Sequence, residues 1–360
     1  MRIAIVSTPF VRVPPSGYGG TELFCGHLTE ALVRRGHYVT LYATGDSQCS
    51  GELRACFPEA SWPPSETADL AHARFALHDI SRDRQGYDAV LINSPVAIKV
   101  ARDLGVPVAY TIHHHSQERF SRVYTAHPEA RYVAISRRQL ELEAPLRDAT
   151  VIHHGVDDRD YPLSLQDEGY VLHLGRFAPE KGTHHALDAA HRAGVPIALA
   201  GRVHEKDDDH QYYEREIAPR IGHDGVDLVG EADFRHKVEL FRGARALLCP
   251  IEWEEPFGLV AIEAMLTGTP LIGFRRGSFP EIVDEGVTGV LVDGVDEMAT
   301  AIRCAEGWDR ARCAERARKR FSANRMAADY EALFVSMLHR QSGTSFISGS
   351  SSAGFSRLIG

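Results

Sequence analysis

Short, β-prone apolar runs recur along the chain, and helical patterns or loops separate them. Strands that alternate with helices favour a parallel sheet covered by helices on both faces. A first series of runs lies at residues 3–7, 38–43, 89–93, 108–112, 132–135 and 150–153. A second series lies at residues 170–174, 197–200, 226–229, 246–249, 271–273 and 290–292. The pattern therefore predicts an α/β chain built from two doubly wound, Rossmann-like domains.

A chain of 360 residues is long enough for two domains that each bury a core of their own. Residues 155–168 are polar, contain Pro162 and have no apolar periodicity, which is typical of a linker. The cleft between the two domains is then the expected ligand site. Apolar residues at nearly helical spacing predict a closing amphipathic helix over 323–339, and the Ser- and Gly-rich segment 341–360 is expected to be a mobile tail.

Composition narrows the class of protein. A net charge of −9 argues against broad attraction to nucleic acid or anionic lipid, because phosphate binding there requires a basic excess. The six cysteines form no C-x-x-C pair that would indicate a zinc or redox site. The apolar run after Met1 is too short for a signal peptide. We expect a cytoplasmic protein without an integral membrane segment or a nucleic-acid partner, and the oligomeric state stays open.

Two carboxylates, Glu255 and Glu263, stand eight positions apart around the expected start of an apolar helix. Pro256 suits a first helical turn, where its missing N–H costs nothing. The free backbone N–H groups at the start of that helix would point at an anion. One carboxylate could then accept hydroxyls from a hexose and the other from a ribose, as a nucleotide-sugar would require. The alternative is an ordinary amphipathic helix with two solvated glutamates.

The segments around this motif carry a family resemblance. They are Gly175–Gly182 (GRFAPEKG), the run 255–263 (EPFGLVAIE), 277–283 (GSFPEIV) and 286–289 (GVTG), in that order. The chain resembles the retaining glycosyltransferases of family 4, which include glycogen synthase-like group 1 enzymes and have the GT-B fold. The resemblance covers roughly residues 1–340 and is most specific over 170–292. It implies an acceptor-side domain at 1–160, a nucleotide-sugar domain at 161–322, and a helix at 323–340 that returns to the N-terminal domain.

The resemblance also assigns roles in holding the donor. Glu255 would hold the sugar hydroxyls, Glu263 the ribose, and Arg176 and Lys181 the diphosphate. Arg176 and Lys181 follow a predicted strand within one loop, where an arginine fork and a mobile lysine charge could converge on a leaving group. The alternative for such a loop is solvated surface. In the run after Glu255, the backbone N–H groups of Phe257, Gly258 and Leu259 would contact the sugar and phosphate.

A glycine-rich loop before the first helix is a second candidate clamp. It reads Gly17-Tyr18-Gly19-Gly20-Thr21-Glu22, where glycine lets the backbone approach a ligand and a helix N-terminus favours phosphate. We expect Gly19, Gly20 and Thr21 to line the inner cleft. The alternative is a flexible glycine turn with Thr21 as helix cap. About ten residues separate this loop from the first strand, so it is not the dinucleotide fingerprint, and an NAD enzyme is disfavoured.

Three histidines, His113, His114 and His115, follow the strand at 108–112, at the sheet edge where ligands bind. The resemblance places a histidine here against the donor sugar, and His113 best fits it, although either neighbour could take its role. Consecutive histidines cannot easily share one metal ion. The resemblance also puts Ser136 near the acceptor, whereas its position before a predicted helix indicates an N-cap.

Several further residues receive structural assignments. The segment 153–157 (HHGVD) is expected to organise the hinge, and Glu281 matches the family's downstream P-E pair. The acidic run 207–209, with Glu205 and Lys206, is expected to be a solvated loop. We therefore expect no required metal and no cofactor.

The resulting hypothesis is a retaining hexosyltransferase that uses a nucleoside diphosphate sugar, with UDP favoured by the family. The catalytic candidates are Glu255, His113, Arg176 and Lys181. The departing phosphate oxygen would help to deprotonate the acceptor, and domain closure would exclude water. The acceptor hydroxyl belongs to a small molecule or glycan, and the loop at 11–15 (VRVPP) would reshape its side of the cleft. Alternatives on the same fold are a glycosyl phosphorylase, a nucleotide-sugar epimerase or a non-catalytic nucleotide-binding module.

Overall fold

The computed structural model describes residues 1–347 except 18, 103, 204–206 and 224. The N-terminal half forms a seven-stranded parallel sheet of order β3-β2-β1-β4-β5-β6-β7. Its strands are β1 (Arg2–Val6), β2 (Tyr38–Ala43), β3 (Glu52–Ala55), β4 (Ala89–Ile92), β5 (Val108–Ile112), β6 (Arg131–Ala134) and β7 (Ala149–Val151). Alternate residues of β1 face opposite sides, because Ile3 and Ile5 belong to one apolar cluster and Ala4 and Val6 to the other. Both faces of this sheet are therefore buried.

The C-terminal half forms a six-stranded parallel sheet of order β10-β9-β8-β11-β12-β13. Its strands are β8 (Tyr170–Leu174), β9 (Ile197–Ala200), β10 (Val226–Gly230), β11 (Ala244–Cys249), β12 (Leu271–Phe274) and β13 (Gly289–Val292). Apolar clusters again cover both faces. In both sheets the order reverses beside the first strand, which is the doubly wound arrangement.

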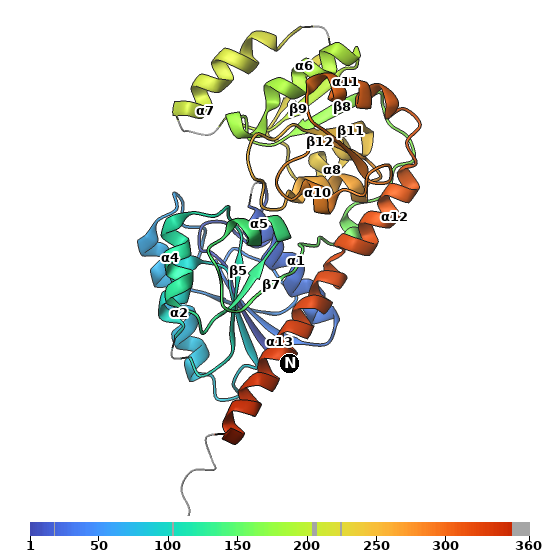
Figure 1. Cartoon of the computed structure of the whole chain (residues 1–360). Coiled ribbons are helices and arrows are strands. Elements are labelled where there is room, and N and C mark those ends of the chain that lie inside the picture. The colour runs from blue at the N-terminus through green and yellow to red at the C-terminus, as the bar shows by residue number, and fades with distance from the viewer. Residues whose placement is uncertain (18, 103, 204–206, 224, 348–360) are drawn as a thin grey trace, which may run out of the picture.

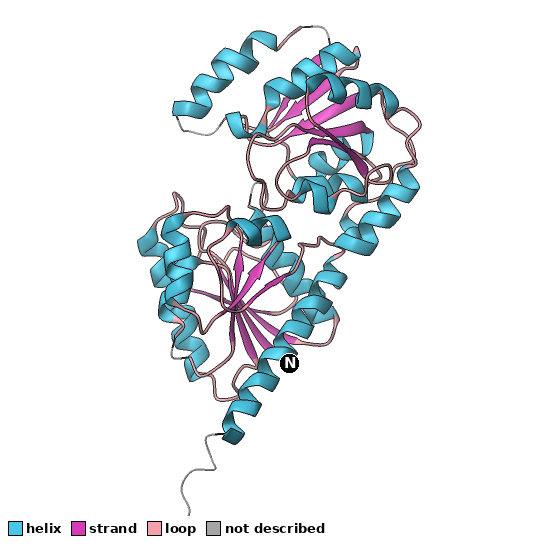
Figure 2. Ribbon diagram, viewed as in Figure 1, coloured by secondary structure: helices cyan, strands magenta, loops and turns pink. Residues whose placement is uncertain are grey.

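Helices surround each sheet, and Figure 2 shows the strands at the centre of each domain. Those of the N-terminal domain are α1 (Gly20–Arg34), α2 (Glu66–Arg82), α3 (Pro95–Val100), α4 (Glu118–Ala126) and α5 (Arg137–Leu142). Those that follow are α6 (Thr183–Ala193), α7 (Asp207–Tyr212), α8 (Phe234–Gly243), α9 (Leu259–Leu266), α10 (Phe279–Ile282), α11 (Val295–Cys304), α12 (Arg310–Phe321) and α13 (Ala323–Ile347). Short turns of other helix types lie at Asp158–Asp160, Pro179–Lys181, Tyr213–Ile217 and Ala218–Arg220.

The last helix joins the two domains. In Figure 1, α12 and α13 descend from the C-terminal domain along the side of the N-terminal domain. Met326, Tyr330 and Phe334 of α13 pack in the same apolar cluster as α1, and the Tyr330 hydroxyl lies 2.8 Å from Oγ1 of Thr111 in β5. The predicted two-domain α/β architecture with a returning C-terminal helix is confirmed. The exact domain boundaries at 160 and 322 stay a prediction. The predicted tail is wrong for residues 341–347, because α13 continues through them to Ile347, and the rest of the predicted tail lies outside the described residues.

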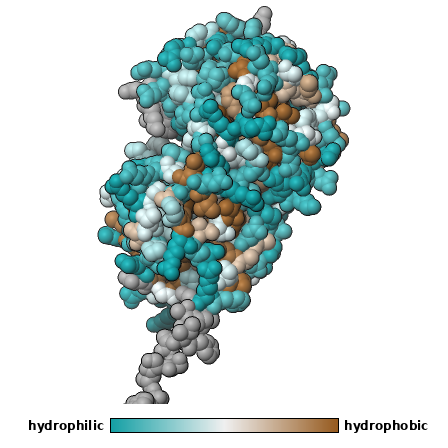
Figure 3. Space-filling view, viewed as in Figure 1, coloured by the Kyte–Doolittle hydropathy of each residue, from teal (hydrophilic) through white to brown (hydrophobic). Residues whose placement is uncertain are grey.

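Strand β3 is an edge strand that we did not predict. Its sequence Glu-Leu-Arg-Ala is polar and half-buried, so it lacks the apolar run of a strand covered on both faces. Figure 3 shows a mostly hydrophilic surface, with apolar residues gathered on the N-terminal domain beside α13. Among the described residues, none of the helices combines the length and apolar character needed to cross a membrane.

Candidate active site

The carboxylate of Glu255 lies in a loop between β11 and α9, not at the edge of a helix that begins near Pro256. The helix begins at Leu259, because its N-cap Gly258 has a φ of 87°, a left-handed conformation that interrupts the helix before it. Glu255 therefore lies four positions before the helix, and Glu263 is the fifth helical residue, little more than one turn inside it. The predicted placement of Pro256 in the first turn is wrong. In the first turn Ala261 donates its N–H to the carbonyl of the N-cap Gly258 at 3.0 Å, and the N–H groups of the helical residues before it have no intrahelical partner.

Glu255 is held by two donors. Its Oε2 lies 2.6 Å from Nζ of Lys181 and 3.1 Å from Nε1 of Trp253. The Lys181 ammonium also lies 4.8 Å from the centre of the Trp253 ring, a cation–π contact. The loop after β8 and the loop before α9 therefore place a cation and an anion in direct contact. These two side chains, Lys181 and Glu255, are both predicted catalytic residues. Trp253 was missed, although its position two residues before Glu255 could have suggested it.

Arg176 lies on the same loop as Lys181 but has different partners. Its guanidinium lies 2.6 Å from Oε1 of Glu180 and 3.3 Å from Oδ2 of Asp209. Residues 207–209 form the first half of α7, and Asp209, the third helical residue, is buried, so the prediction of a solvated loop at 207–209 is wrong. Glu205 and Lys206 lie outside the described residues. The loop after β8 thus presents two cations, each tied to a carboxylate.

Glu263 is buried and strongly hydrogen-bonded. Its Oε1 accepts a bond of 2.6 Å from the Tyr161 hydroxyl and another of 2.6 Å from Nζ of Lys237 in α8. The neighbouring His27 of α1 is also buried, and burial lowers its pKa to about 4. Tyr161 belongs to the segment predicted as a linker, yet its side chain is fully buried. Neither Tyr161 nor Lys237 was predicted, because both reach Glu263 only through the packing of distant segments.

The glycine-rich loop and α9 approach each other across the two domains. A Cβ added to Gly20 would lie 3.5 Å from Cδ1 of Leu259, so the starts of α1 and α9 are neighbours. The N-cap of α1 is Gly19, and no side chain caps this helix, so the alternative role of Thr21 as cap is wrong. Tyr18 lies outside the described residues. Two helix starts with unpaired N–H groups thus meet at one place between the domains.

The three consecutive histidines point in different directions. His113 is half-buried and lies 2.9 Å from Oδ1 of Asn93, and burial lowers its pKa to about 3. Asn93 donates its amide N–H to the carbonyl of Val6, which leaves its Oδ1 to accept from Nε2–H of His113. His113 is therefore neutral, with the lone pair on Nδ1. His114 turns inward to the Tyr124 hydroxyl at 2.6 Å.

His115 is the histidine that contacts the C-terminal domain. Its ring meets that of Trp253 edge-on, with centroids 5.5 Å apart. His115 and Glu255 also line one small cavity between the domains. The contact therefore connects the end of β5 to the loop that carries Glu255. The role of His113 against a sugar stays a prediction, as does which histidine would touch the ligand.

Ser136 is the N-cap of α5, because its buried hydroxyl accepts a bond of 3.0 Å from the Gln139 N–H. The capping interpretation is confirmed, and the acceptor-side role stays a prediction. At the expected hinge, Nε2 of His153 lies 3.1 Å from Oε2 of Glu281. The backbone N–H of Arg137 donates to the same oxygen, and that of Arg138 donates to Oε1 of the same carboxylate. Glu281 therefore ties the C-terminal domain to the start of α5.

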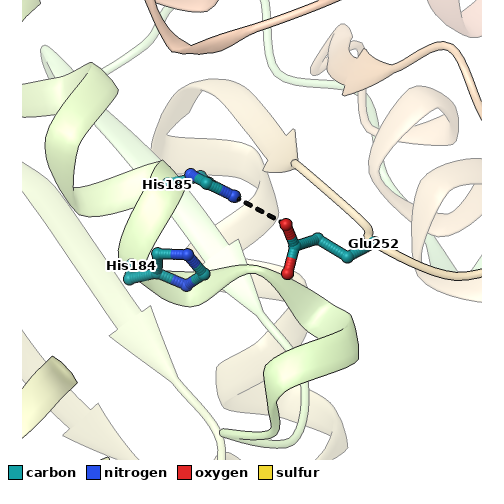
Figure 4. Close-up of side chains that lie close together, drawn as sticks. All are labelled: His184, His185 and Glu252. Carbon is teal, nitrogen blue, oxygen red and sulfur yellow. Dashed lines mark hydrogen bonds and ion pairs between the residues drawn. The ribbon is translucent and has the colours of Figure 1, made fainter. Parts of the chain in front are cut away.

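One group of side chains in the described part of the chain could hold a metal ion: His184, His185 and Glu252. Figure 4 shows His185 directed at Glu252, whose Oε1 lies 3.0 Å from its Nε2, with His184 beside it. His184 is engaged elsewhere, since its Nδ1 lies 2.8 Å from the Tyr212 hydroxyl. Both histidines lie in the first turn of α6, where the helix dipole disfavours a cation.

Comparisons with known proteins assign this geometry to a family. The profile of "Glycosyl transferases group 1" matches residues 157–320, and that of "Glycosyltransferase Family 4" matches residues 18–160. Glycogen synthase of Mycobacterium tuberculosis is 28% identical over 295 residues, which cover 78% of this chain and 68% of the relative.

Solved structures show the same fold. Sucrose-phosphate synthase of Thermosynechococcus elongatus has a TM-score of 0.77 at 22% identity, over 96% of this chain and all of that one. The Anabaena protein HepE in complex with UDP and glucose has a TM-score of 0.70 at 19% identity, over 93% of this chain and all of that one. With one profile on each domain, the chain belongs to the family 4 and group 1 glycosyltransferases of GT-B fold.

Proposed function

We propose that the protein is a retaining hexosyltransferase that moves a hexose from a nucleoside diphosphate sugar to a hydroxyl of a small molecule or glycan. The observation that carries the proposal is the contact of Lys181 with Glu255 beside the start of α9. A cation, a carboxylate and unpaired N–H groups at one place match the diphosphate and the hydroxyls of such a donor. UDP is the favoured nucleotide, supported by its presence in the HepE structure.

Different residues would bind different parts of the donor. Lys181 and Arg176 would neutralise the diphosphate, and the N–H groups of Gly258 and Leu259 would bind its oxygens or the sugar. Glu255 would accept from sugar hydroxyls. Glu263 would accept from the ribose through Oε2, because the bonds from Tyr161 and Lys237 both go to Oε1. Gly19, Gly20 and Thr21 of the N-terminal domain would line the side of the donor site that faces the start of α9.

The proposed reaction depends on neutralising the negative charge of the departing nucleoside diphosphate. Two cations on the diphosphate oxygens would stabilise the departing nucleoside diphosphate, and Lys181 would release Glu255 in order to bind them. Attack on the same face as departure would retain the configuration, with a phosphate oxygen taking the acceptor proton. Neutral His113 cannot donate a second proton, but the lone pair on its Nδ1 could accept from a sugar hydroxyl. Closure of the domains would exclude water.

The first experiment identifies the donor. Thermal shifts with UDP-, GDP- and ADP-sugars should show stabilisation by one nucleotide class, because binding to the folded state raises the melting temperature. Turnover of that donor with a panel of hydroxyl acceptors then tests transfer, and NMR of the product gives its anomeric configuration. An inverted anomer would contradict the mechanism. Sugar phosphate formed only with inorganic phosphate would indicate a phosphorylase, and binding without any donor hydrolysis would indicate a non-catalytic module.

Metal dependence needs its own experiment. We propose that Arg176 and Lys181 supply the positive charge, so turnover should persist in EDTA. The His185→Gln variant is the matched control, because it removes one side chain of the group that could hold a metal ion. Complete loss of turnover in EDTA that a divalent cation restores would overturn the metal-independent mechanism, and failure of the cation to restore His185→Gln would place the ion at His184, His185 and Glu252.

A further inference from the structure

A second cavity between the domains is lined by four arginines. It has a volume of about 430 Å³, and its arginines come from both domains: Arg137 and Arg138 from α5, and Arg275 and Arg276 from the loop after β12. Such a concentration of positive charge contrasts with the net charge of −9 of the whole chain. A local positive field in a cleft attracts anions selectively.

The carboxylates of this cavity are already engaged. Glu254 makes a two-point contact with Arg138, with N to O distances of 2.8 and 3.0 Å. Glu281 accepts from two backbone N–H groups and from His153. The carboxylate of Glu141 lies 3.6 Å from Arg138, so it also faces that cation. Among the described residues, none of these three carboxylates forms an ion pair with the guanidinium of Arg137 or Arg276, which leaves positive charge without an ion-pair partner at those two side chains.

That positive charge resides on Arg137 and Arg276. In the described part of the chain, neither guanidinium has a hydrogen bond or an ion pair, whereas Arg275 is paired with Glu285 at 2.7 Å. The two unpaired guanidinium groups approach the cavity from different domains. Each presents a planar fork that matches a phosphate or carboxylate.

The loop after β12, which lines this cavity, packs against Glu255. Gly277, next to Arg276, packs so closely on Glu255 that an added Cβ would lie 2.5 Å from its backbone nitrogen. The N–H of Ser278 donates to the Glu255 carbonyl at 3.0 Å. Arg138 and Glu254 line both this cavity and the smaller one that reaches Glu255. A molecule with one group bound by the arginines would thus extend toward the catalytic carboxylate.

We propose that the acceptor carries an anionic group, a phosphate or a carboxylate, and that Arg137 and Arg276 bind it. This proposal rests on the proposed function, because it names the substrate class of the same site. A volume of about 430 Å³ is at the lower end of small-molecule sites, which suits a phosphorylated or carboxylated sugar or polyol. The anion would lie away from the attacking hydroxyl and would position it.

The test begins with binding in the absence of donor. Glucose, glucose 6-phosphate and glucuronate are titrated into the full-length wild type, the double variant Arg137→Gln/Arg276→Gln, and the surface control Arg122→Gln. We expect at least one anionic sugar to bind more tightly than glucose by tenfold or more. That preference should disappear in the double variant and persist in the control. The double variant should keep the wild-type melting temperature, since the guanidinium groups of Arg137 and Arg276 have no ion pair to lose, and Arg122→Gln should change it little, since Arg122 pairs with Glu118 on the exposed surface.

One further variant, Arg176→Gln, distinguishes anion binding in the arginine-lined cavity from anion binding at the donor phosphate site. If Arg176→Gln abolishes anion binding and the arginine double variant does not, the anions occupy the donor phosphate site and the proposal is overturned. Equal binding of neutral and anionic sugars also overturns it. Donor turnover by the wild type is measured separately with the nucleotide-sugar panel. If the wild type turns over donor but does not prefer anionic acceptors, only the proposal of an anionic acceptor is contradicted. If it binds no donor, the proposed function is contradicted.

Discussion

Nζ of Lys181 lies 2.6 Å from Oε2 of Glu255, although 74 positions separate the two residues in the chain. Their side chains are 23% and 14% exposed, so the pair is accessible to a ligand yet shielded enough for its charges to matter. The Trp253 indole donates to the same oxygen. When a diphosphate arrives, Lys181 can exchange its carboxylate partner for phosphate while Trp253 keeps Glu255 in place.

This pairing predicts coupled effects on catalysis. Lys181→Met and Glu255→Gln should each lower kcat/KM by roughly ten- to a hundred-and-fifty-fold, the scale of about 1.5–3 kcal/mol for a charged hydrogen bond. Because the two side chains touch, the double variant should lose less than the sum. Steady-state kinetics with the identified donor measure the cycle, and Lys99→Met on the N-terminal surface is the control. Strict additivity would show that the two groups act independently.

Arg176 tests the second cation of the donor site. Arg176→Ala should cost about 1.5–3 kcal/mol of transition-state binding. Asp209→Asn should cost less, because Arg176 keeps its contact with Glu180 when Asp209 no longer holds it. Arg192→Ala, which removes a surface ion pair between α6 and α11, serves as the control in kcat/KM measurements. An unchanged kcat/KM for Arg176→Ala would remove this residue from the site.

The sequence predicted the fold better than the partners within the site. Strands covered on both faces, such as β2 and β5, appear as continuous apolar runs, and their bounds agree with the structure. The candidate residues at the ends of strands also follow from topology, because loops after parallel strands meet at one edge. The exact partner of each side chain does not, since Tyr161 and Lys237 reach Glu263 from 102 and 26 positions away. No local pattern records such packing.

Tyr161 provides a test of the buried Glu263. Tyr161→Phe removes a 2.6 Å hydrogen bond to a carboxylate that is almost fully buried, and it should lower the free energy of unfolding by about 1.5–3 kcal/mol. If Glu263 binds the ribose, the KM for the donor should rise more than kcat falls. Chemical denaturation and steady-state kinetics measure the two effects. A loss of stability without a change in KM would limit Glu263 to a structural role.

Buried histidines predict a loss of stability in mild acid. Burial lowers the pKa of five of them from 6.5 to about 3 or 4: His27, His72, His113, His114 and His173. The unfolded chain therefore takes up protons first as the pH falls below 6.5. Stability is full above that pH and declines toward pH 4, by about 1.4 kcal/mol per pH unit for each histidine. Burial raises the pKa of Glu22 and Asp69, which opposes this trend.

The His72→Asn variant isolates one of these contributions. Denaturant unfolding between pH 7 and 4.5 should show a slope that is smaller by about 1.4 kcal/mol per pH unit than in the wild type. The exposed His78→Asn on the same helix is the control and should keep the wild-type slope. Equal slopes in all three proteins would mean that His72 is protonated in the folded state.

Gly277 and Gly286 form a matched pair for testing how the loop after β12 positions Glu255. Both have positive φ, 58° and 75°, so alanine costs about 1–2 kcal/mol of backbone strain at either position. They differ in their surroundings. A Cβ at Gly277 would lie 2.5 Å and 2.7 Å from the backbone nitrogen and oxygen of Glu255, whereas a Cβ at Gly286 would meet no atom within 4 Å.

Gly277→Ala should therefore displace Glu255, because two backbone segments cannot yield as a flexible side chain can. We expect a further loss of about 1–3 kcal/mol in stability from overpacking and a fall in kcat/KM of at least roughly tenfold. Gly286→Ala should show only the strain, with kcat/KM near the wild-type value. Thermal unfolding and donor turnover measure the two effects side by side. If Gly277→Ala kept full activity at reduced stability, the contacts with Lys181 and Trp253, and not this loop, would position Glu255.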